Sequence, residues 1–212
     1  EKPLWKLVSD MSPEELVSCI DFRYLTDVIT PEEAIEFLES KVPSKSEREE
    51  KILKDGYPAY TTSAGWLGYS DDKIRNLLQS AVQLGWTHFK FKVGTNIEDD
   101  IRRLKIASEV IGPDRVLMID ANQVWDVKEA INWINKLSQF KPWFIEEPTS
   151  PDDIIGHLTI KDSVGPIKVA TGEHCHNRVM FKQFFQSQAL DICQLDSCRL
   201  GGVNEVLAVF LM

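Results

Sequence analysis

The chain has 212 residues, of which 43% are hydrophobic and 27% charged, and its formal net charge is -9 at pH 7. This composition predicts a globular protein, with one well-buried domain or a domain plus a smaller appendage, and excludes collagen-like, low-complexity and disordered classes. The acidic balance argues against nucleic-acid and anionic-membrane partners, because both need a clustered cationic field. We therefore expect a small-molecule partner. No apolar run approaches the roughly 20 residues of a membrane span.

The four cysteines, Cys19, Cys175, Cys193 and Cys198, form neither a C-x-x-C pattern nor a dense disulfide framework. The N-terminus lacks the charged-then-apolar layout of a signal peptide. We therefore expect reduced thiols in a cytoplasmic or organellar protein that is not secreted. Because the chain does not begin with methionine, we expect a processed chain or a fragment.

Residues 1–57 read as helical and highly charged. The segments 12–15 and 30–33 share one pattern, in which a hydroxyl residue is followed by proline and then by two glutamates. Such a hydroxyl N-cap, with proline at the first helical position and glutamate three residues after the cap, predicts a capping box and a short helix in each case. The charged run 44–55 is expected to be a solvated helix or linker.

From Pro58 onward, β-type runs alternate with amphipathic helical stretches. The expected strands cover residues 59–63, 88–93, 116–120, 143–146, 167–171 and 191–196. Four of the intervening helices have predicted caps, at Ser70, Asn96, Asp126 and Asn177, and Glu129 would complete a capping box with Asp126. Strands spaced by helices predict an α/β fold with a parallel sheet over residues 58–212.

Charged residues end most of these strands, about one strand–helix unit apart. They are Lys90 and Lys92, Asp120, Glu146 with Glu147, Glu173, and Asp196. In a parallel barrel the carboxyl ends of the strands meet at one rim, where such barrels place their active sites. We therefore expect these groups to be neighbours in space.

Side-chain alternation predicts which groups point inward. Lys90 and Lys92 share one face of their strand, while Phe89, Phe91 and Val93 share the opposite face and would pack on the surrounding helices. The alternative, two solvated lysines on an edge strand, fits these apolar neighbours less well. Beside a second lysine and a divalent cation, Lys92 should have a lowered pKa, and its neutral amine could act as a base.

The same alternation selects the carboxylates. Glu146 has Ile145 on the outward face and is preferred over Glu147, which begins the turn before Pro148. Each acid alone could be an ordinary surface carboxylate, but Asp120, Glu146 and Glu173 together on one rim need a compensating cation. All-oxygen ligands favour Mg2+ over zinc.

Two histidines, His174 and His176, flank Cys175 beside Glu173. Neighbours on one loop do not by themselves close a tetrahedral zinc site, so we expect both to be ordinary loop histidines.

Five ordered motifs carry a resemblance to a known family. They are FKFKVG (89–94), MIDANQVWD (118–126), FIEEPTSPDD (144–153), ATGEHCHNRV (170–179) and QLDSCRLGG (194–202). They resemble the mandelate racemase subgroup of the enolase superfamily and, within it, the L-fuconate dehydratases. The resemblance implies a partial (β/α)8 TIM barrel of about six units over residues 58–212, preceded in residues 1–57 by a short helical remnant of the capping domain. It implies truncation at both ends.

The resemblance also implies roles for seven residues. Asp120, Glu146 and Glu173 would bind Mg2+, Lys92 would take the proton alpha to the substrate carboxylate, Lys90 would bind and neutralise that carboxylate, Asn122 would contact substrate, and Asp196 would be the acid of a His-Asp dyad.

The implied activity is a magnesium-dependent hydro-lyase reaction on a sugar acid, from L-fuconate to 2-keto-3-deoxy-L-fuconate with loss of the 3-hydroxyl as water. The implied location is the mitochondrion. Two alternatives stay open. None of the four histidines, at positions 88, 157, 174 and 176, follows the sixth expected strand, so the chain could be a catalytically incomplete fragment or isoform without its general-acid histidine. It could also be another acid-sugar dehydratase or a racemase of the superfamily. Homo-oligomerisation is left open.

Overall fold

The computed structural model describes residues 1–212 and contains ten α-helices, two 3-10 helices and five strands. In chain order they are α1 (Leu4–Asp10), α2 (Pro13–Ser18), α3 (Pro31–Lys41), η1 (Val42–Ser44), α4 (Lys45–Asp55), α5 (Asp71–Gln83), β1 (His88–Lys92), α6 (Ile97–Ile111), β2 (Val116–Asp120), α7 (Val127–Leu137), η2 (Ser138–Phe140), β3 (Phe144–Glu146), α8 (Ile154–Val164), β4 (Lys168–Thr171), α9 (Arg178–Gln186), β5 (Ile192–Cys193) and α10 (Val203–Leu211).

These elements form two compact units. The first comprises Glu1–Pro58, Cys175–Gln186 and Leu195–Met212, and the second comprises Ala59–His174 and Ser187–Gln194. The sheet therefore lies in the second unit. Two later segments join residues 1–58 in the first unit, whereas the predicted division fell at residue 57/58 alone.

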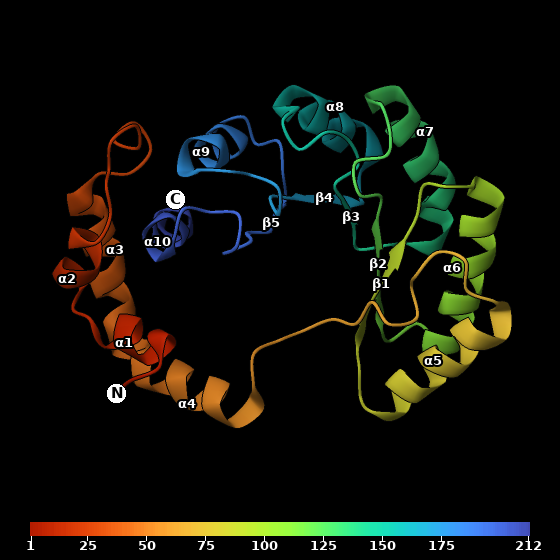
Figure 1. The fold of residues 1–212 in the computed structure, drawn as a ribbon, viewed down its shortest axis with the longest axis horizontal. Helices are drawn as coiled ribbons and strands as arrows, with labels where there is room; N and C mark the ends of the chain where they lie inside the picture. Colours follow the sequence, from red (N-terminus) through yellow and green to blue (C-terminus); the bar gives the residue numbers. More distant parts are fainter. The chain divides into compact units, whose positions relative to one another are not determined.

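The second unit is built on a five-stranded parallel sheet in the order β1-β2-β3-β4-β5 (Figure 1). Each strand pairs with the next strand along the chain, as expected for successive βα units. In the register, Lys92 lies opposite Asp120 and Asp120 lies opposite Glu146. The residues at the carboxyl ends of β1, β2 and β3 are therefore aligned across the sheet.

One face of the sheet is covered by α5, α6, α7 and α8 (Figure 1). Side chains of that face and of the helices form the main core, which includes Phe89, Phe91, Leu117, Ile119, Ile145, Ile74, Leu78, Leu104, Ile134 and Ile160. The opposite face has a smaller apolar layer, Met118, Phe144 and Ala170. Because alternate residues point to opposite faces, Lys90 lies on the face of Met118, away from the main core.

Local sequence explains most helix starts. Ser12 and Thr30 each form the expected capping box, with Glu15 and Glu33 respectively. The caps at Ser70 and Asn96 are also confirmed, because each side chain accepts a backbone N–H of the first turn.

The predicted capping box of Asp126 and Glu129 is wrong. Asp126 does precede α7, but its side chain makes no capping hydrogen bond. Burial of Ala130, Ile134 and Leu137 on one side of α7 holds this helix without it.

The expected first strand, residues 59–63, is reduced to an isolated parallel bridge between Thr61 and Phe89. The bridge is made by Thr61 N–H to His88 O, 3.0 Å, and Lys90 N–H to Thr61 O, 2.9 Å. Farther along, Gly65 O accepts from Lys92 N–H at 2.8 Å. The segment therefore follows β1 without forming a regular strand.

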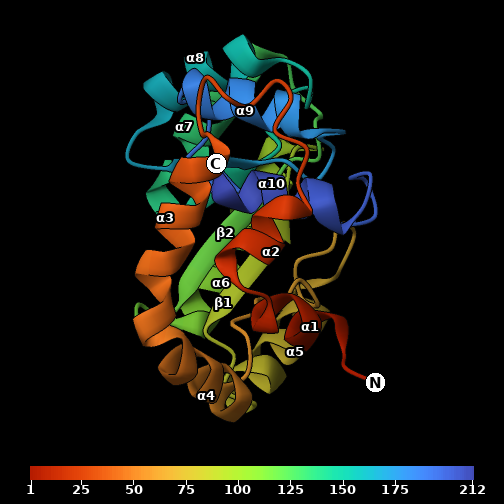
Figure 2. The ribbon, with the colours of Figure 1, turned by 90° about the vertical axis from the view of Figure 1, so that its left-hand side faces the viewer.

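The first unit is helical (Figure 2). Its small apolar clusters bring together Val17, Ile29 and Ala34 in one place and Ile20, Leu25 and Ala208 in another. Ion pairs within this unit join Lys182 to Asp27 and Arg178 to Glu205. None of the helices in either unit has the length and apolarity needed to cross a membrane.

Candidate active site

The carboxyl ends of β1, β2 and β3 bring the predicted lysines and two of the predicted carboxylates together. Lys90 Nζ lies 2.5 Å from Glu146 Oε2 and 3.0 Å from Asp120 Oδ2. Lys92 Nζ lies 2.5 Å from the same Asp120 oxygen. Lys90 is only 5% exposed, and both acids are buried. The side chains of the two lysines and the two acids therefore point to the same face of the sheet, as the alternation of the strands predicts.

Electrostatics at this rim are dominated by buried negative charge. Burial and the neighbouring Asp120 carboxylate raise the pKa of Glu146. Burial alone would lower the pKa of Lys90, but Glu146 and Asp120 outweigh it and raise that pKa. The result is a charged ammonium group held between two carboxylates.

Glu173 follows β4 and is partly exposed. Burial raises its pKa, and the nearby charges of Glu147 and Asp120 raise it further. A carboxyl group whose pKa is raised by neighbouring carboxylates indicates a place that a cation would stabilise. The donor set of Asp120, Glu146 and Glu173 consists of carboxylate oxygens alone, which fits Mg2+.

The side chains whose ligand atoms lie close enough to share one ion overlap this set only at Glu173. One ligand atom from each of Glu147, Glu173 and His174 lies within 4.8 Å of the others. His174 Nδ1 lies 2.5 Å from Glu147 Oε1, and Gln123 Nε2 lies 2.8 Å from the same imidazole nitrogen. Glu173 therefore belongs to both sets. The set of Glu147, Glu173 and His174 includes an imidazole nitrogen, which suits a transition metal better than Mg2+.

Sequence reasoning missed this second set. Glu147 was set aside in favour of Glu146, and His174 was expected to be an ordinary loop histidine. The backbone has positive φ at Asn122, Gln123 and Glu147, which turns these residues away from the regular alternation of their strands. Non-glycine residues rarely adopt this conformation, so strand periodicity gave no signal for it.

The remaining predicted residues lie in different surroundings. Asn122 is exposed, and its backbone N–H donates to Asp120 Oδ1 at 3.0 Å. Asp196 belongs to the first unit, where its carboxylate accepts the N–H of Cys198 at 2.8 Å. Its role in a His-Asp dyad stays a prediction.

The turn after β1 is held by a buried ion pair that sequence reasoning did not identify. Arg103 and Asp100 are both fully buried and pair through Nη2 and Oδ1. Arg103 also donates to Lys92 O at 2.7 Å, and Asp100 accepts the N–H of Gly94 at 2.7 Å. The backbone on both sides of Val93 is thus fixed by one charged pair.

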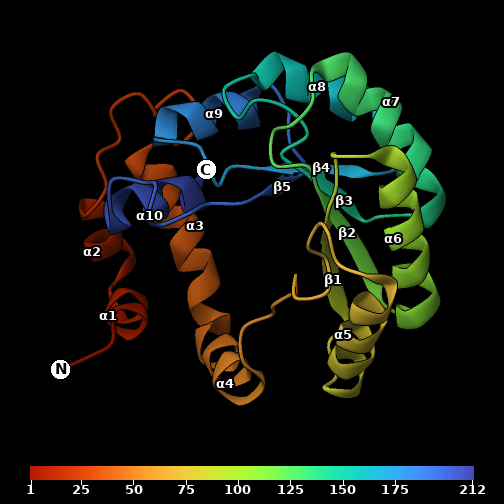
Figure 3. The same ribbon diagram turned by 45° about the vertical axis from the view of Figure 1, so that its right-hand side comes forward.

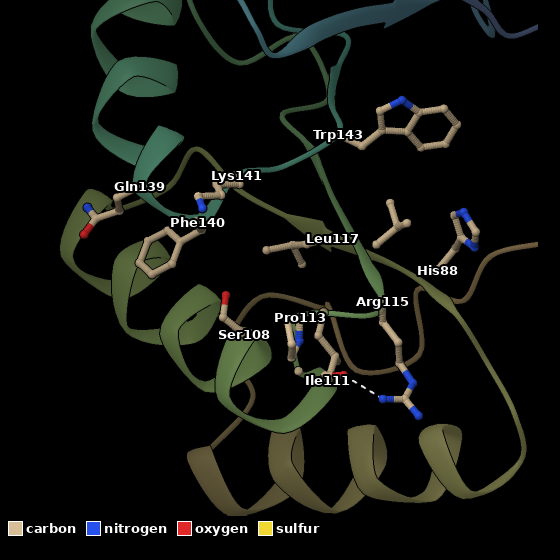
Figure 4. A pocket seen from close by; sticks show the side chains of 12 residues that line it. His88, Ser108, Ile111, Pro113, Arg115, Leu117, Gln139, Phe140, Lys141 and Trp143 are labelled. Carbon is tan, nitrogen blue, oxygen red and sulfur yellow. Dashed lines mark hydrogen bonds between the residues drawn. The ribbon is translucent and has the colours of Figure 1, made fainter.

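The opposite ends of the same strands border a cavity of about 730 Å³ (Figure 4). His88, Leu117 and Trp143 line it together with residues of α6 and η2. None of the predicted catalytic, substrate or metal residues lies there, so the cavity and the charged rim are separate features.

Comparison with known families decides the classification. A family model described as enolase C-terminal domain-like matches residues 73–212. The chain belongs to this family. The resemblance to the enolase superfamily is therefore confirmed.

Relatives of this enolase C-terminal domain-like chain are closely similar over its whole length. The mitochondrial enolase superfamily member 1 of Homo sapiens is 59% identical over 213 residues, which cover 100% of this chain and 48% of the relative. The L-galactonate dehydratase of Hypocrea jecorina is 60% identical over 216 residues, with the same two coverages. The chain thus spans about half the length of the curated relatives it matches.

Solved structures of the family confirm the fold class. The crystal structure of human mitochondrial enolase superfamily member 1 matches with a TM-score of 0.96 and 58% identity, over 98% of this chain and 48% of that one. The L-talarate/galactarate dehydratase from Salmonella typhimurium LT2, liganded with Mg and L-lyxarohydroxamate, matches with a TM-score of 0.67 and 35% identity, over 71% of this chain and 38% of that one. The α/β fold is accordingly part of a TIM barrel, as predicted, with five strands and a bridge in place of six strands.

Proposed function

We propose that this chain carries the proton-abstracting half of a magnesium-dependent acid-sugar dehydratase. The observation that carries the proposal is the contact of Lys92 with Asp120 and of Lys90 with both Asp120 and Glu146, all at the carboxyl ends of adjacent strands. The names of relatives support it, because two of them are an L-galactonate dehydratase and an L-talarate/galactarate dehydratase.

Lys92 is the proposed base. Its side chain is partly buried and ends at the charged rim. As a neutral amine, it would remove the proton from the carbon next to the substrate carboxylate. Arg103 holds the Lys92 carbonyl, so the backbone from which this side chain extends is fixed before substrate arrives.

Lys90 is proposed to bind the substrate carboxylate, and Asn122 to contact the adjacent hydroxyl groups. Lys90 stays charged between Asp120 and Glu146, since those acids raise its pKa. A fixed positive charge stabilises the negative charge that develops on the carboxylate when the alpha proton leaves.

Asp120, Glu146 and Glu173 are the proposed Mg2+ ligands. When bound, the ion would act as a Lewis acid on the substrate carboxylate. Removal of the hydroxyl at C3 as water then needs a general acid. Within this class we propose L-fuconate as substrate and a mitochondrial location, the latter in line with the name of the human relative.

Exchange of the alpha proton tests the base separately from dehydration. The purified chain with Mg2+ and L-fuconate in deuterated water should incorporate deuterium at C2, as measured by NMR, and Lys92→Ala should abolish the incorporation. Lys128→Gln, on exposed α7 surface, is the matched control and should exchange normally. An unsubstituted chain that exchanges no substrate proton at saturating Mg2+, or a Lys92→Ala variant that exchanges as well, would refute the proposal.

Product analysis distinguishes the open alternatives. Appearance of 2-keto-3-deoxy-L-fuconate supports the complete dehydratase, whereas exchange without water loss supports a chain that lacks its general acid. Parallel reactions with L-galactonate and galactarate separate L-fuconate from the substrates in the relatives' names. Inversion at C2 without water loss would indicate a racemase.

A metal titration distinguishes the two overlapping ligand sets. If Mg2+ uses Asp120, Glu146 and Glu173, Glu146→Gln weakens Mg2+ binding strongly and His174→Gln does so little. If the metal uses Glu147, Glu173 and His174, His174→Gln weakens Mg2+ binding strongly and Glu146→Gln does so little. Isothermal titration of the chain with Mg2+ measures both.

A further inference from the structure

Residues 61–65, which precede α5, run along the outer edge of β1, the strand that carries both lysines (Figure 3). Three backbone hydrogen bonds join this segment to β1: Thr61 N–H donates to His88 O, Lys90 N–H donates to Thr61 O, and Lys92 N–H donates to Gly65 O. Two of the three are made by lysines of the rim. The position of this segment is therefore coupled to the positions of the two ammonium groups.

Gly65 allows the approach. A Cβ atom at this residue would lie 2.1 Å from Lys90 O and 2.7 Å from Phe91 Cα, both of them backbone atoms. Only a residue without a side chain fits there. The backbone of Gly65 is thus in direct contact with the backbone of β1. This contact fixes the position of the backbone at the next residue, Trp66.

Two aromatic rings that flank this segment face the lysines. Lys92 Nζ lies 5.8 Å from the centre of the Trp66 ring, and Lys90 Nζ lies 4.9 Å from the centre of the Tyr60 ring. Cations at such distances from a ring are attracted to its face. Yet Trp66 is 50% exposed and Tyr60 is 42% exposed. Each ring therefore meets an ammonium group and still presents a large area to solvent.

We propose that Tyr60 and Trp66 form the wall that packs against the carbon chain of the sugar acid, and that Trp66 selects acids of several carbons over short hydroxy acids. This inference rests on the proposed function, since it takes Lys90 as the group that binds the substrate carboxylate. The carbons beyond C2 then extend past the lysines, where their C–H groups meet the electron-rich face of the indole. A three-carbon acid ends before that face and gains nothing from it.

Binding measurements with two acids test the assignment. Isothermal titration with L-fuconate and with glycerate, both in saturating Mg2+, is applied to the unsubstituted chain, Trp66→Leu and Trp66→Phe. We expect Trp66→Leu to weaken L-fuconate binding about 10-fold, equivalent to about 1.4 kcal/mol, and glycerate binding less than about 2-fold on the same scale. Trp66→Phe keeps an aromatic ring, so its affinity for the sugar acid should lie between those of the unsubstituted chain and of Trp66→Leu.

Trp143→Leu is the matched control. Trp143 is 42% exposed, belongs to the same unit and lies at the opposite end of the strands (Figure 4). The Trp143→Leu variant should bind both acids as the unsubstituted chain does. Circular dichroism of all variants establishes that they fold.

Three results would overturn the inference. They are equal weakening of both acids by Trp66→Leu, an equal effect of Trp143→Leu, and an unsubstituted chain that binds L-fuconate no better than glycerate. Failure of the proposed function has a different signature, which is the absence of Lys92-dependent proton exchange in the unsubstituted chain.

Discussion

The buried pair of Arg103 and Asp100 makes a sharp test of what supports the rim. Replacing Arg103 with methionine keeps most of the side-chain volume and removes the charge. Asp100 then stays buried with only the N–H groups of Gly94 and Trp133 as donors, and Lys92 O loses its side-chain donor. Removing one partner of a buried ion pair typically costs about 3–5 kcal/mol.

The cost is a large share of the stability of a domain, which is about 5–15 kcal/mol. With a urea m-value of about 2 kcal/mol per molar, the midpoint of unfolding should fall by about 2 M. Urea titration followed by tryptophan fluorescence measures the shift. Trp133 is a direct reporter, because its indole nitrogen lies 3.3 Å from Asp100 Oδ2.

A double variant and a surface control separate charge burial from general damage. Arg103→Met with Asp100→Leu removes both buried charges and should recover about 1 kcal/mol or more of the loss, because no buried carboxylate is left unpaired. Asp99, which also pairs with Arg103, keeps its pair with Arg102 in both variants. Arg75→Met breaks an exposed pair with Glu109 between α5 and α6 and should cost less than about 1 kcal/mol. The reasoning is refuted if Arg103→Met costs no more than Arg75→Met, or if the double variant is less stable than the single one.

Three further results are expected. Burial lowers the pKa of His157 from its usual 6.5, so the unfolded chain binds more protons, and the free energy of unfolding should decrease as pH falls below 6.5; urea titrations across this range should show a smaller slope for His157→Gln. Gly65→Ala should cost about 1–3 kcal/mol because its Cβ would overlap Lys90 O, whereas Gly201→Ala, with ordinary contacts, should be neutral by the same titration. Thr30→Ala should cost about 1 kcal/mol by loss of the N-cap, and calorimetry showing an unchanged melting temperature would contradict this.

Strand alternation was sufficient to predict the charged rim from the sequence. In β1 each lysine is flanked by an aromatic residue that must point to the helices, so the lysines had to point the other way. The same argument placed Asp120 and Glu146 beside them. These are local patterns, and the register of the parallel strands then places Lys92 opposite Asp120 and Asp120 opposite Glu146.

Local patterns gave less where glycine breaks a helical period or where a contact between distant segments decides the structure. Helix α8 lies between two expected strands, but no start or end was predicted for it, because Gly156 interrupts its sequence and its apolar residues show no helical period. A Cβ at Gly156 would lie 2.2 Å from Asp153 Oδ2, so the glycine serves the cap at the start of the helix. The contact of His174 with Glu147 likewise joins two loops that no local rule connects.

The alignment of β1, β2 and β3 has a consequence for folding. Shifting β1 by one residue against β2 would turn its lysines toward the helices and its aromatic residues toward the rim, because side chains alternate. Chains with β1 in the wrong register would thus lack both lysines of the charged rim, although Asp120 and Glu146 would stay aligned between β2 and β3. A ligand that needs the lysines binds only correctly paired chains and draws the population toward them by mass action. A substrate held by the lysines would then select the register of β1 as well as take part in chemistry.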